Sequence, residues 1–447
     1  MTGRHVGVLG DATPMGGSQA KERTIMITTR RNLLRVTADP LTMTRRDVFR
    51  LSVAITLALT VFLGVPAHAA VHGASAVWGG NASSTGTHVR RLSNGKIAFV
   101  SASITNASSI GVINPNGSAL KMLTPDCLLR VRVCLIREVA WSPNGSRLAF
   151  VRGQVGGGGL PIPSRMSLFV MDADGRHAKR LATCGGACGA QYGSRLSWSP
   201  DGSRIAFSRF DSAGRTSGVF VAQANGAGVR RLTRCGSPRC LDVSPTWSPG
   251  GSRIVFVRNP RQGSVLKIVR ADGSGVRTLT SPPVNAENAV WSPSGRTIAF
   301  DGNRGVYSVN PDGSHLRLLA SGPGRSVSPG VPAWSPDGRR ILFLSTPGNS
   351  QAYAAEVSVM NANGTQQRRL YHSVCCVSNA AGPIWSPDGK RIAFGVVLDT
   401  KTQSGGFLGL NETRSGIFLM KTDGSKLHRV LRFPLAEMQI AWQPIGG

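Results

Sequence analysis

Short apolar stretches with a period of two recur along residues 91–447, each beside a turn rich in Pro, Gly, Asp and Ser. In Ile205-Ala206-Phe207, Ile and Phe fall on one face of an extended strand and Ala on the other, as in a sheet packed between neighbours. The adjoining Pro-x-Gly forms a tight turn because Pro fixes φ and Gly accepts positive φ. The pattern therefore predicts an all-β fold built from hairpins.

One block, Trp-Ser-Pro-x-Gly followed by a strand, recurs along the chain. It starts at Trp141, Trp198, Trp247, Trp291, Trp334 and Trp385, in steps of 57, 49, 44, 43 and 51 residues. Such periods are typical of the four-stranded blades of a β-propeller. A second block carries a turn glycine in each unit, at Gly117, Gly175, Gly226, Gly273, Gly313, Gly364 and Gly424. We expect one buried Trp to anchor each blade to its neighbour.

The two ends of the repeat region share one more block. SNGKIAF at 93–99 lacks the Trp, and IAWQP at 440–444 supplies Trp442 without a following strand. Pairing of these segments in one sheet would close a ring and leave no long exposed edge. We predict a seven-bladed β-propeller of four-stranded antiparallel blades over residues 91–447, closed by this shared blade. The alternative is an open array, which would need polar capping repeats.

The segment before the repeats has the pattern of an export signal. Residues 51–65 are apolar but too short for a comfortable membrane span, three arginines precede them, and Ala67-His68-Ala69 suits a signal peptidase. We interpret 43–69 as a signal peptide, 1–42 as an untranslated or disordered leader, and 70–90 as a linker. Arg45-Arg46 indicates the twin-arginine route. General secretion and an uncleaved anchor are the alternatives. The protein is expected to be periplasmic, wall-associated or secreted.

The WSPDG-x-RIAF block with VMDADG and RLT resembles the WD-like repeat of TolB and of the propellers attached to prolyl oligopeptidases. The resemblance covers residues 91–447 and implies the fold, with binding of envelope partners as in TolB, a periplasmic scaffold. Two features depart from TolB. The α/β domain of roughly 130 residues expected before its propeller is absent, and seven repeats stand where TolB would have six. The resemblance therefore names no partner.

Motifs of known enzymes are missing from the sequence. No G-x-S-x-G elbow of a peptidase, phosphate loop or dinucleotide fingerprint is present. His177, His315 and His428 follow turns of different blades and are expected on the surface, so we predict no metal, no cofactor and no catalytic residue. An active site drawn from several blades would escape such a search. A propeller lyase or hydrolase is therefore the alternative to a binding protein.

Eight cysteines fall in connections between an outer strand and the next innermost strand. They form the local pairs Cys127 and Cys134, Cys184 and Cys188, Cys235 and Cys240, and Cys375 and Cys376. In an exported protein we expect four short disulfides. The adjacent pair is the weakest case, because its ring would be strained. Structural zinc is the rival interpretation, although no matched His accompanies the cysteines.

Four acids precede a blade Trp by three to five residues: Glu138, Asp242, Glu287 and Glu437. We expect them at one mouth of the central channel, where carboxylates could hold a cation or a basic segment of a partner. Each could instead pair with a local Arg or cap a loop. The long loops lie on the same predicted face. We therefore expect the ligand there rather than at the hairpin-face residues Arg147, Arg204 and Arg253.

Charge leaves a further possibility. The net charge is +30, and it is +25 for residues 70–447. Arginines of the outer strands and turns, such as Arg180, Arg230, Arg231, Arg368 and Arg369, could bind an anionic wall polymer, or they could simply keep the surface soluble. The sequence thus predicts an exported, monomeric, non-enzymatic scaffold that binds an extracytoplasmic protein or envelope polymer and no specific nucleic acid.

Overall fold

The computed structural model of the chain contains two units, Met1–Gly86 and Thr87–Gly447. It describes residues 23–28, 33–38, 93–102, 108–124, 134–155, 163–184, 195–210, 217–235, 240–258, 263–281, 284–321, 332–345, 356–372, 377–379, 382–401, 407–410, 416–432 and 439–445. In the first unit, β1 (Arg23–Thr28) pairs antiparallel with β2 (Leu33–Ala38). The predicted signal peptide and linker lie outside the described residues. Within the described ranges, no helix has the length and apolarity to cross a bilayer.

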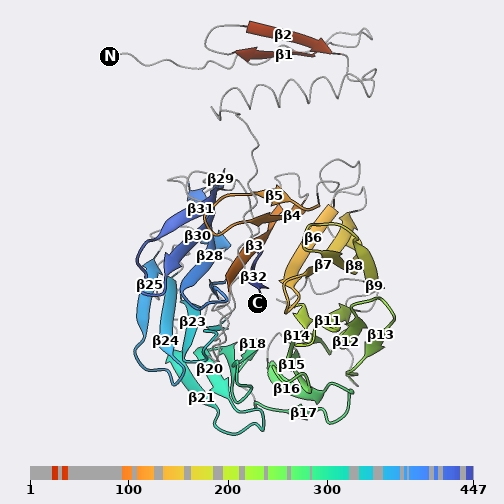
Figure 1. Cartoon of the computed structure of the whole chain (residues 1–447), viewed down its shortest axis with the longest axis vertical. Coiled ribbons are helices and arrows are strands. Elements are labelled where there is room, and N and C mark those ends of the chain that lie inside the picture. Colours follow the sequence, from red (N-terminus) through yellow and green to blue (C-terminus); the bar gives the residue numbers. More distant parts are fainter. Residues whose placement is uncertain are drawn as a thin grey trace, which may run out of the picture. The chain divides into compact units, whose positions relative to one another are not determined.

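Seven antiparallel sheets surround a central axis in the second unit (Figure 1), which confirms the predicted propeller. Blade 1 contains β32 (Gln439–Ile445), β3 (Ser93–Ala102), β4 (Ser108–Ile113) and β5 (Lys121–Met122). Blade 2 contains β6 (Cys134–Trp141), β7 (Arg147–Val155), β8 (Pro163–Asp172) and β9 (Lys179–Thr183). Blade 3 contains β10 (Ser197–Trp198), β11 (Arg204–Phe210), β12 (Ser217–Gln223) and β13 (Val229–Arg231). In each, strands are given from the innermost outwards.

The remaining blades follow the same order. Blade 4 contains β14 (Asp242–Trp247), β15 (Arg253–Arg258), β16 (Val265–Arg270) and β17 (Arg277–Thr278). Blade 5 contains β18 (Glu287–Trp291), β19 (Ile298–Gly302), β20 (Gly305–Val309) and β21 (Arg317–Ser321). Blade 6 contains β22 (Ala333–Trp334), β23 (Arg340–Ser345), β24 (Glu356–Asn361) and β25 (Arg368–His372). Blade 7 contains β27 (Ile384–Trp385), β28 (Arg391–Lys401), β30 (Gly416–Lys421) and β31 (His428–Arg432), with β26 (Val377–Asn379) and β29 (Phe407–Leu410) also paired to β28.

Blade 1 joins the two ends of the repeat region, as predicted. Strand β32 pairs with β3 so that Trp442 lies opposite Ile97. The Trp442 indole N–H donates to the Gly95 carbonyl at 3.1 Å, and the Gln443 amide donates to the Gly145 carbonyl of blade 2 at 2.7 Å. The last strand of the ring is therefore fixed both within its own blade and to the next one.

The Trp-Ser-Pro-x-Gly hairpins have a shared hydrogen-bond pattern. In blade 3 the Ser199 hydroxyl accepts the Arg204 N–H at 2.9 Å, and the Asp201 carboxylate accepts the Ser203 N–H at 3.0 Å. The hydrogen bond from the Ser199 hydroxyl lowers the pKa of Asp201 to about 2. Gly202 has φ 66°, the left-handed conformation for which glycine suits this turn.

Blade tryptophans fix neighbouring blades to each other. Six of the seven are buried, and Trp334 is half-buried. The Trp198 indole N–H donates to the Ala140 carbonyl of the preceding blade at 3.1 Å, and Trp291 and Trp385 do the same. The guanidinium of Arg204 lies 4.7 Å from the ring centroid of Trp247 in the next blade, and Arg147 lies over Trp198 in the same way. Both hairpin-face arginines therefore serve blade packing.

Candidate functional site

In blades 2 to 5 the third residue before the blade Trp is polar, and it lies in or just before the innermost strand. In blades 2, 4 and 5 this residue has a positive φ, namely Glu138 at 49°, Ser244 at 53° and Asn288 at 48°. The strand pairing shifts register at each of these places. A bulge turns a side chain out of the alternation of its strand and towards a new direction. In blade 3 the same position holds Arg195.

Glu138 lies buried beside Arg195 of the adjacent blade. Its side chain is 6% exposed, and its carboxylate accepts a hydrogen bond from the backbone N–H of Leu196. Within the described part of the chain, Oε2 of Glu138 has no hydrogen-bond partner. Burial raises the pKa of Glu138 well above its ordinary value, against the opposing effect of the Arg195 guanidinium. The carboxyl group is thus held where its charge is only partly compensated.

Asp301 of β19 is a second buried acid that interacts with the same arginine. It is 2% exposed and accepts a hydrogen bond from the Asn288 amide at 3.2 Å, while its Oδ1 has no partner in the described part of the chain. Burial raises the pKa of Asp301 well above its ordinary value. The Asn288 hydrogen bond and Arg195 oppose that rise, and Glu287 adds to it. We call Glu138, Arg195, Glu287, Asn288 and Asp301 the inner-ring cluster.

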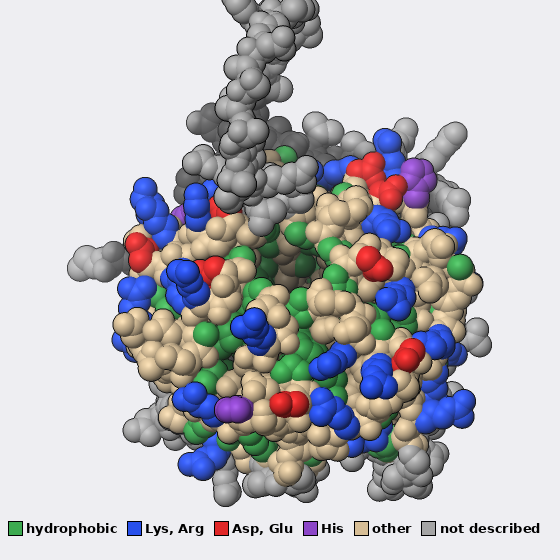
Figure 2. Space-filling model, turned by 60° about the horizontal axis from the view of Figure 1, so that its bottom comes forward, with side chains coloured by type: hydrophobic (Ala, Val, Ile, Leu, Met, Phe, Trp, Pro, Cys, Tyr) green, Lys and Arg blue, Asp and Glu red, His purple; other side chains and the backbone are tan. Residues whose placement is uncertain are grey.

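The charges in this cluster influence each other across blades 2, 3 and 5. Burial lowers the pKa of Arg195, and the carboxylates of Glu138 and Asp301 oppose that shift. Half-buried Glu287 also has a raised pKa because of burial. Two acids, Glu138 and Asp301, therefore share one guanidinium, and Glu287 acts on Asp301. Figure 2 shows the propeller hollowed at its centre, where the innermost strands meet. Oε2 of Glu138 and Oδ1 of Asp301 have no partner among the described residues, so a positively charged group that reached them would meet carboxylate acceptors.

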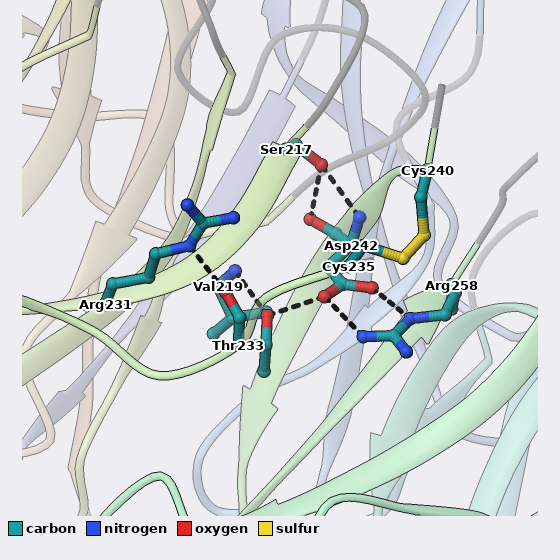
Figure 3. Close-up of a disulfide and its surroundings, with 8 residues drawn as sticks. All are labelled: Ser217, Val219, Arg231, Thr233, Cys235, Cys240, Asp242 and Arg258. Atoms are coloured by element: carbon teal, nitrogen blue, oxygen red, sulfur yellow. Dashed lines mark hydrogen bonds and ion pairs between the residues drawn. A yellow bond between two sulfur atoms is a disulfide. The ribbon is translucent and has the colours of Figure 1, made fainter. Parts of the chain in front are cut away.

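Asp242 is engaged elsewhere, in a local ion pair (Figure 3). It is fully buried, and its two carboxylate oxygens accept from Arg258 of the neighbouring strand at 2.6 and 2.8 Å. The Thr233 hydroxyl donates to it at 2.6 Å, and the Asp242 backbone N–H donates to the Ser217 hydroxyl at 2.8 Å. The local pairing considered as an alternative therefore describes Asp242. Of the four predicted acids, the cluster holds Glu138 and Glu287, and Glu437 lies outside the described residues.

A disulfide joins Cys235 and Cys240, whose Cα atoms are 5.8 Å apart. It links the end of blade 3 to the start of blade 4. Cys184 is also disulfide-bonded. Cys134 begins β6, whereas Cys127, Cys188, Cys375 and Cys376 lie outside the described residues. Cys235, Cys240 and Asp242 place possible ligand atoms within 4.8 Å of one another. Because the sulfurs bond each other and Arg258 holds the carboxylate, this group does not fit a metal ion.

Sequence reasoning missed Arg195 and Asp301. Alignment of the blades on their Trp residues would have placed Arg195 at the position of Glu138, Ser244 and Asn288. Alignment on the Phe of the second strand shows Asp301 where the other blades have Val, Ser, Leu or Gly. A charged residue at an otherwise small or apolar repeat position was the available signal.

Comparison with known proteins identifies the repeats. The model of the TolB beta propeller domain matches residues 134–330. The Tol-Pal system protein TolB of Anaeromyxobacter dehalogenans strain 2CP-C is 31% identical over 189 residues, which are 40% of this chain and 37% of the relative. The match thus spans well under half of the relative's length. Residues 134–330 therefore resemble the TolB beta propeller domain, and the repeats are TolB-like.

Solved structures with the same fold include enzymes. A prolyl endopeptidase matches with a TM-score of 0.54 and 13% identity, over 78% of this chain and 49% of that one. An oligogalacturonate lyase from Vibrio parahaemolyticus matches with a TM-score of 0.50 and 12% identity, over 76% of this chain and 85% of that one. At such low identity these likenesses show the fold alone.

Proposed function

We propose that the chain is an exported binding scaffold whose inner-ring cluster takes a positively charged segment of an envelope protein. The observation that carries this proposal is the pair of buried carboxylates, Glu138 and Asp301, each with an oxygen that lacks a partner among the described residues. A guanidinium or ammonium group would supply the missing donors. The likeness to TolB, which is part of a Tol-Pal system, supports an envelope location and a protein partner.

Electrostatics favours a cation at this place over the rest of the surface. The chain as a whole is strongly basic, so it repels cationic peptides in general. Within the cluster, Glu138 and Asp301 interact with one arginine, Glu287 acts on Asp301, and burial has raised the pKa of each of the three acids. A bound cation would favour the ionised carboxylates and displace protons from them. Binding should therefore strengthen as the pH rises above the ordinary carboxyl range.

The test is a titration of a labelled hexa-arginine peptide with residues 70–447 at pH 7.5 and 150 mM salt. Fluorescence anisotropy of the peptide measures its binding. The double variant Glu138→Gln with Asp301→Asn should weaken binding at least tenfold, because neutral amides cannot compensate a guanidinium. The control Asp272→Asn with Asp312→Asn removes the same charge from exposed turns, and it should bind as the unmodified protein does. Absence of binding, or equal loss in both variants, would refute the assignment.

A second candidate is a propeller enzyme with a dispersed site, favoured by one observation. Glu138, Arg195 and Asp301 come from three blades, and buried acids with raised pKa values are common among general acids. Screening of polysaccharide and peptide substrates, with Glu138→Gln and Asp301→Asn as inactive controls, tests it. Turnover that both substitutions abolish would establish an enzyme. Turnover that neither substitution affects would show that the activity resides at another site.

A further inference from the structure

Two arginines of blade 3 lie over the same phenylalanine. The guanidinium carbon of Arg209 is 5.5 Å from the ring centroid of Phe220, and that of Arg231 is 5.7 Å from it. Strand register places Phe220 opposite both Phe207 and Arg231, and Arg209 opposite Gly218. Because side chains alternate along a strand, Phe207, Arg209, Gly218, Phe220 and Arg231 share one face of the sheet. The two cations are thus held on the same side of blade 3.

Gly218 leaves room for the Arg231 side chain beside it. A Cβ atom at position 218 would come within 2.9 Å of Nε of Arg231 and 2.8 Å of the Thr233 carbonyl oxygen. The Arg231 Nε–H donates to that carbonyl at 2.7 Å, which fixes the guanidinium above the glycine. Figure 3 shows this hydrogen bond to Thr233, and no dashed line joins the guanidinium to the Asp242–Arg258 pair. Arg231 is therefore ordered before any ligand arrives, which lowers the entropic cost of binding.

No acid neutralises the two arginines in the part of the chain that the structure describes. The ion pairs found there involve other residues: Arg176, His177, Arg258, Arg369 and His372 with their acids. Two guanidinium groups on one ring, without a carboxylate, repel each other. Cation–π contact with Phe220 offsets only part of that repulsion. An anion placed between them would remove it.

Blade 4 shows which ligand suits an arginine at this repeat position. Arg152, Arg209 and Arg258 each stand two residues after the Phe of the second strand. Arg258 binds both oxygens of Asp242, the residue five places before the blade Trp. The corresponding residues are Ile136 in blade 2 and Gly193 in blade 3, so neither of those blades supplies an acid from this position. Among the described residues, none gives Arg209 the carboxylate that Asp242 gives Arg258.

We propose that Arg209 and Arg231, framed by Gly218 and Phe220, bind a carboxylate group of an extracytoplasmic ligand. Blade 2 lacks the arrangement although it has the same cations. Its Arg152 lies 6.0 Å from the Phe169 centroid, Ser167 replaces the glycine, and Arg180 stands at the position of Arg231 without a ring contact in the described structure. The site is therefore specific to blade 3 and independent of the inner-ring cluster.

The experiment is calorimetric titration of residues 70–447 with a hexa-glutamate peptide at 150 mM salt. Arg209→Gln with Arg231→Gln should weaken binding at least tenfold. The matched control, Arg152→Gln with Arg180→Gln, removes the same charge from blade 2 and should change binding less than twofold. Gly218→Ser keeps both cations but displaces Arg231, and it should also weaken binding. Thermal melting of each variant checks that it is folded.

The outcomes distinguish a site from general attraction. Equal loss in the blade 2 and blade 3 double variants would mean that the peptide follows net charge, and the proposal would be wrong. Unchanged binding by the blade 3 double variant would overturn it as well. If a folded Gly218→Ser protein binds as tightly as the unmodified one, the placement of Arg231 is irrelevant and the geometric argument fails.

Discussion

Closure of the ring by Trp442 can be measured against an interior tryptophan. Both Trp442 and Trp291 are 8% exposed, and each indole N–H donates to a backbone carbonyl at 3.1 Å. Truncation of a buried Trp to Ala costs about 3–5 kcal/mol through lost transfer energy and the remaining cavity. If β32 is as firmly packed as an interior strand, Trp442→Ala and Trp291→Ala should lower stability equally. Trp442→Phe, which loses chiefly the hydrogen bond, should cost about 1 kcal/mol.

Urea unfolding followed by far-UV circular dichroism gives the comparison, with the midpoint as the reported quantity because seven blades need not unfold in two states. Deletion of 439–447 should then leave an aggregation-prone protein, since β3 would become an exposed edge. A Trp442→Ala midpoint close to that of the unmodified protein, beside a strongly lowered midpoint for Trp291→Ala, contradicts the reasoning. In that case the last strand would contribute little to the ring.

Three more predictions concern buried charge and the disulfide. Burial raises the pKa of Glu138 and that of Asp301, so their stabilising contribution is full below the unfolded carboxyl pKa and is lost as the pH rises through the folded pKa. The urea midpoint should therefore fall as the pH rises above the ordinary carboxyl range, and it should fall less in the double variant Glu138→Gln with Asp301→Asn. Arg258→Gln should lower the free energy of unfolding by about 3–5 kcal/mol, because it leaves the buried Asp242 charge without its partner. Adding Asp242→Asn to this variant should restore part of the lost stability. Cys235→Ser with Cys240→Ser should lower stability by about 2 kcal/mol, and reductant should then affect the double variant less than the unmodified protein. Non-reducing peptide mapping would show that this bridge forms.

The repeat pattern predicted the fold because each repeat contains the residues that determine the structure of its own blade. Trp-Ser-Pro-x-Gly specifies a hairpin and a buried indole locally, and the split block at the two ends specifies closure. A single repeat does not determine which side chains of different blades contact each other. Arg195 acts on Glu138 of the preceding blade and on Asp301 two blades away, so their relation depends on the ring and not on spacing along the chain.

The prediction that Asp242 lies with Glu138 and Glu287 also shows that spacing along the chain does not determine the surroundings of a side chain. Its distance from Trp247 suggested a place with Glu138 and Glu287, but pairing of β14 with β15 sets it directly opposite Arg258. The carboxylate of Asp242 therefore forms its ion pair with Arg258 inside one blade. Only the register, which the bulge after Val243 shifts, decides between the two environments.

Basic side chains of the outer strands form hydrogen bonds between neighbouring blades. These contacts explain part of the high positive net charge. Lys121 donates to the Asp174 carbonyl of the next blade at 2.9 Å, Lys179 to the Asn225 carbonyl at 2.7 Å and Arg230 to the Ala271 carbonyl at 2.9 Å. The acceptor is a neutral peptide group, so each contact adds a cation to the fold without requiring an acid. Part of the net charge therefore has a structural cause. A case for an anionic ligand must rest on cations without an ion pair, and within the described residues Arg209 forms none while its guanidinium lies over the Phe220 ring.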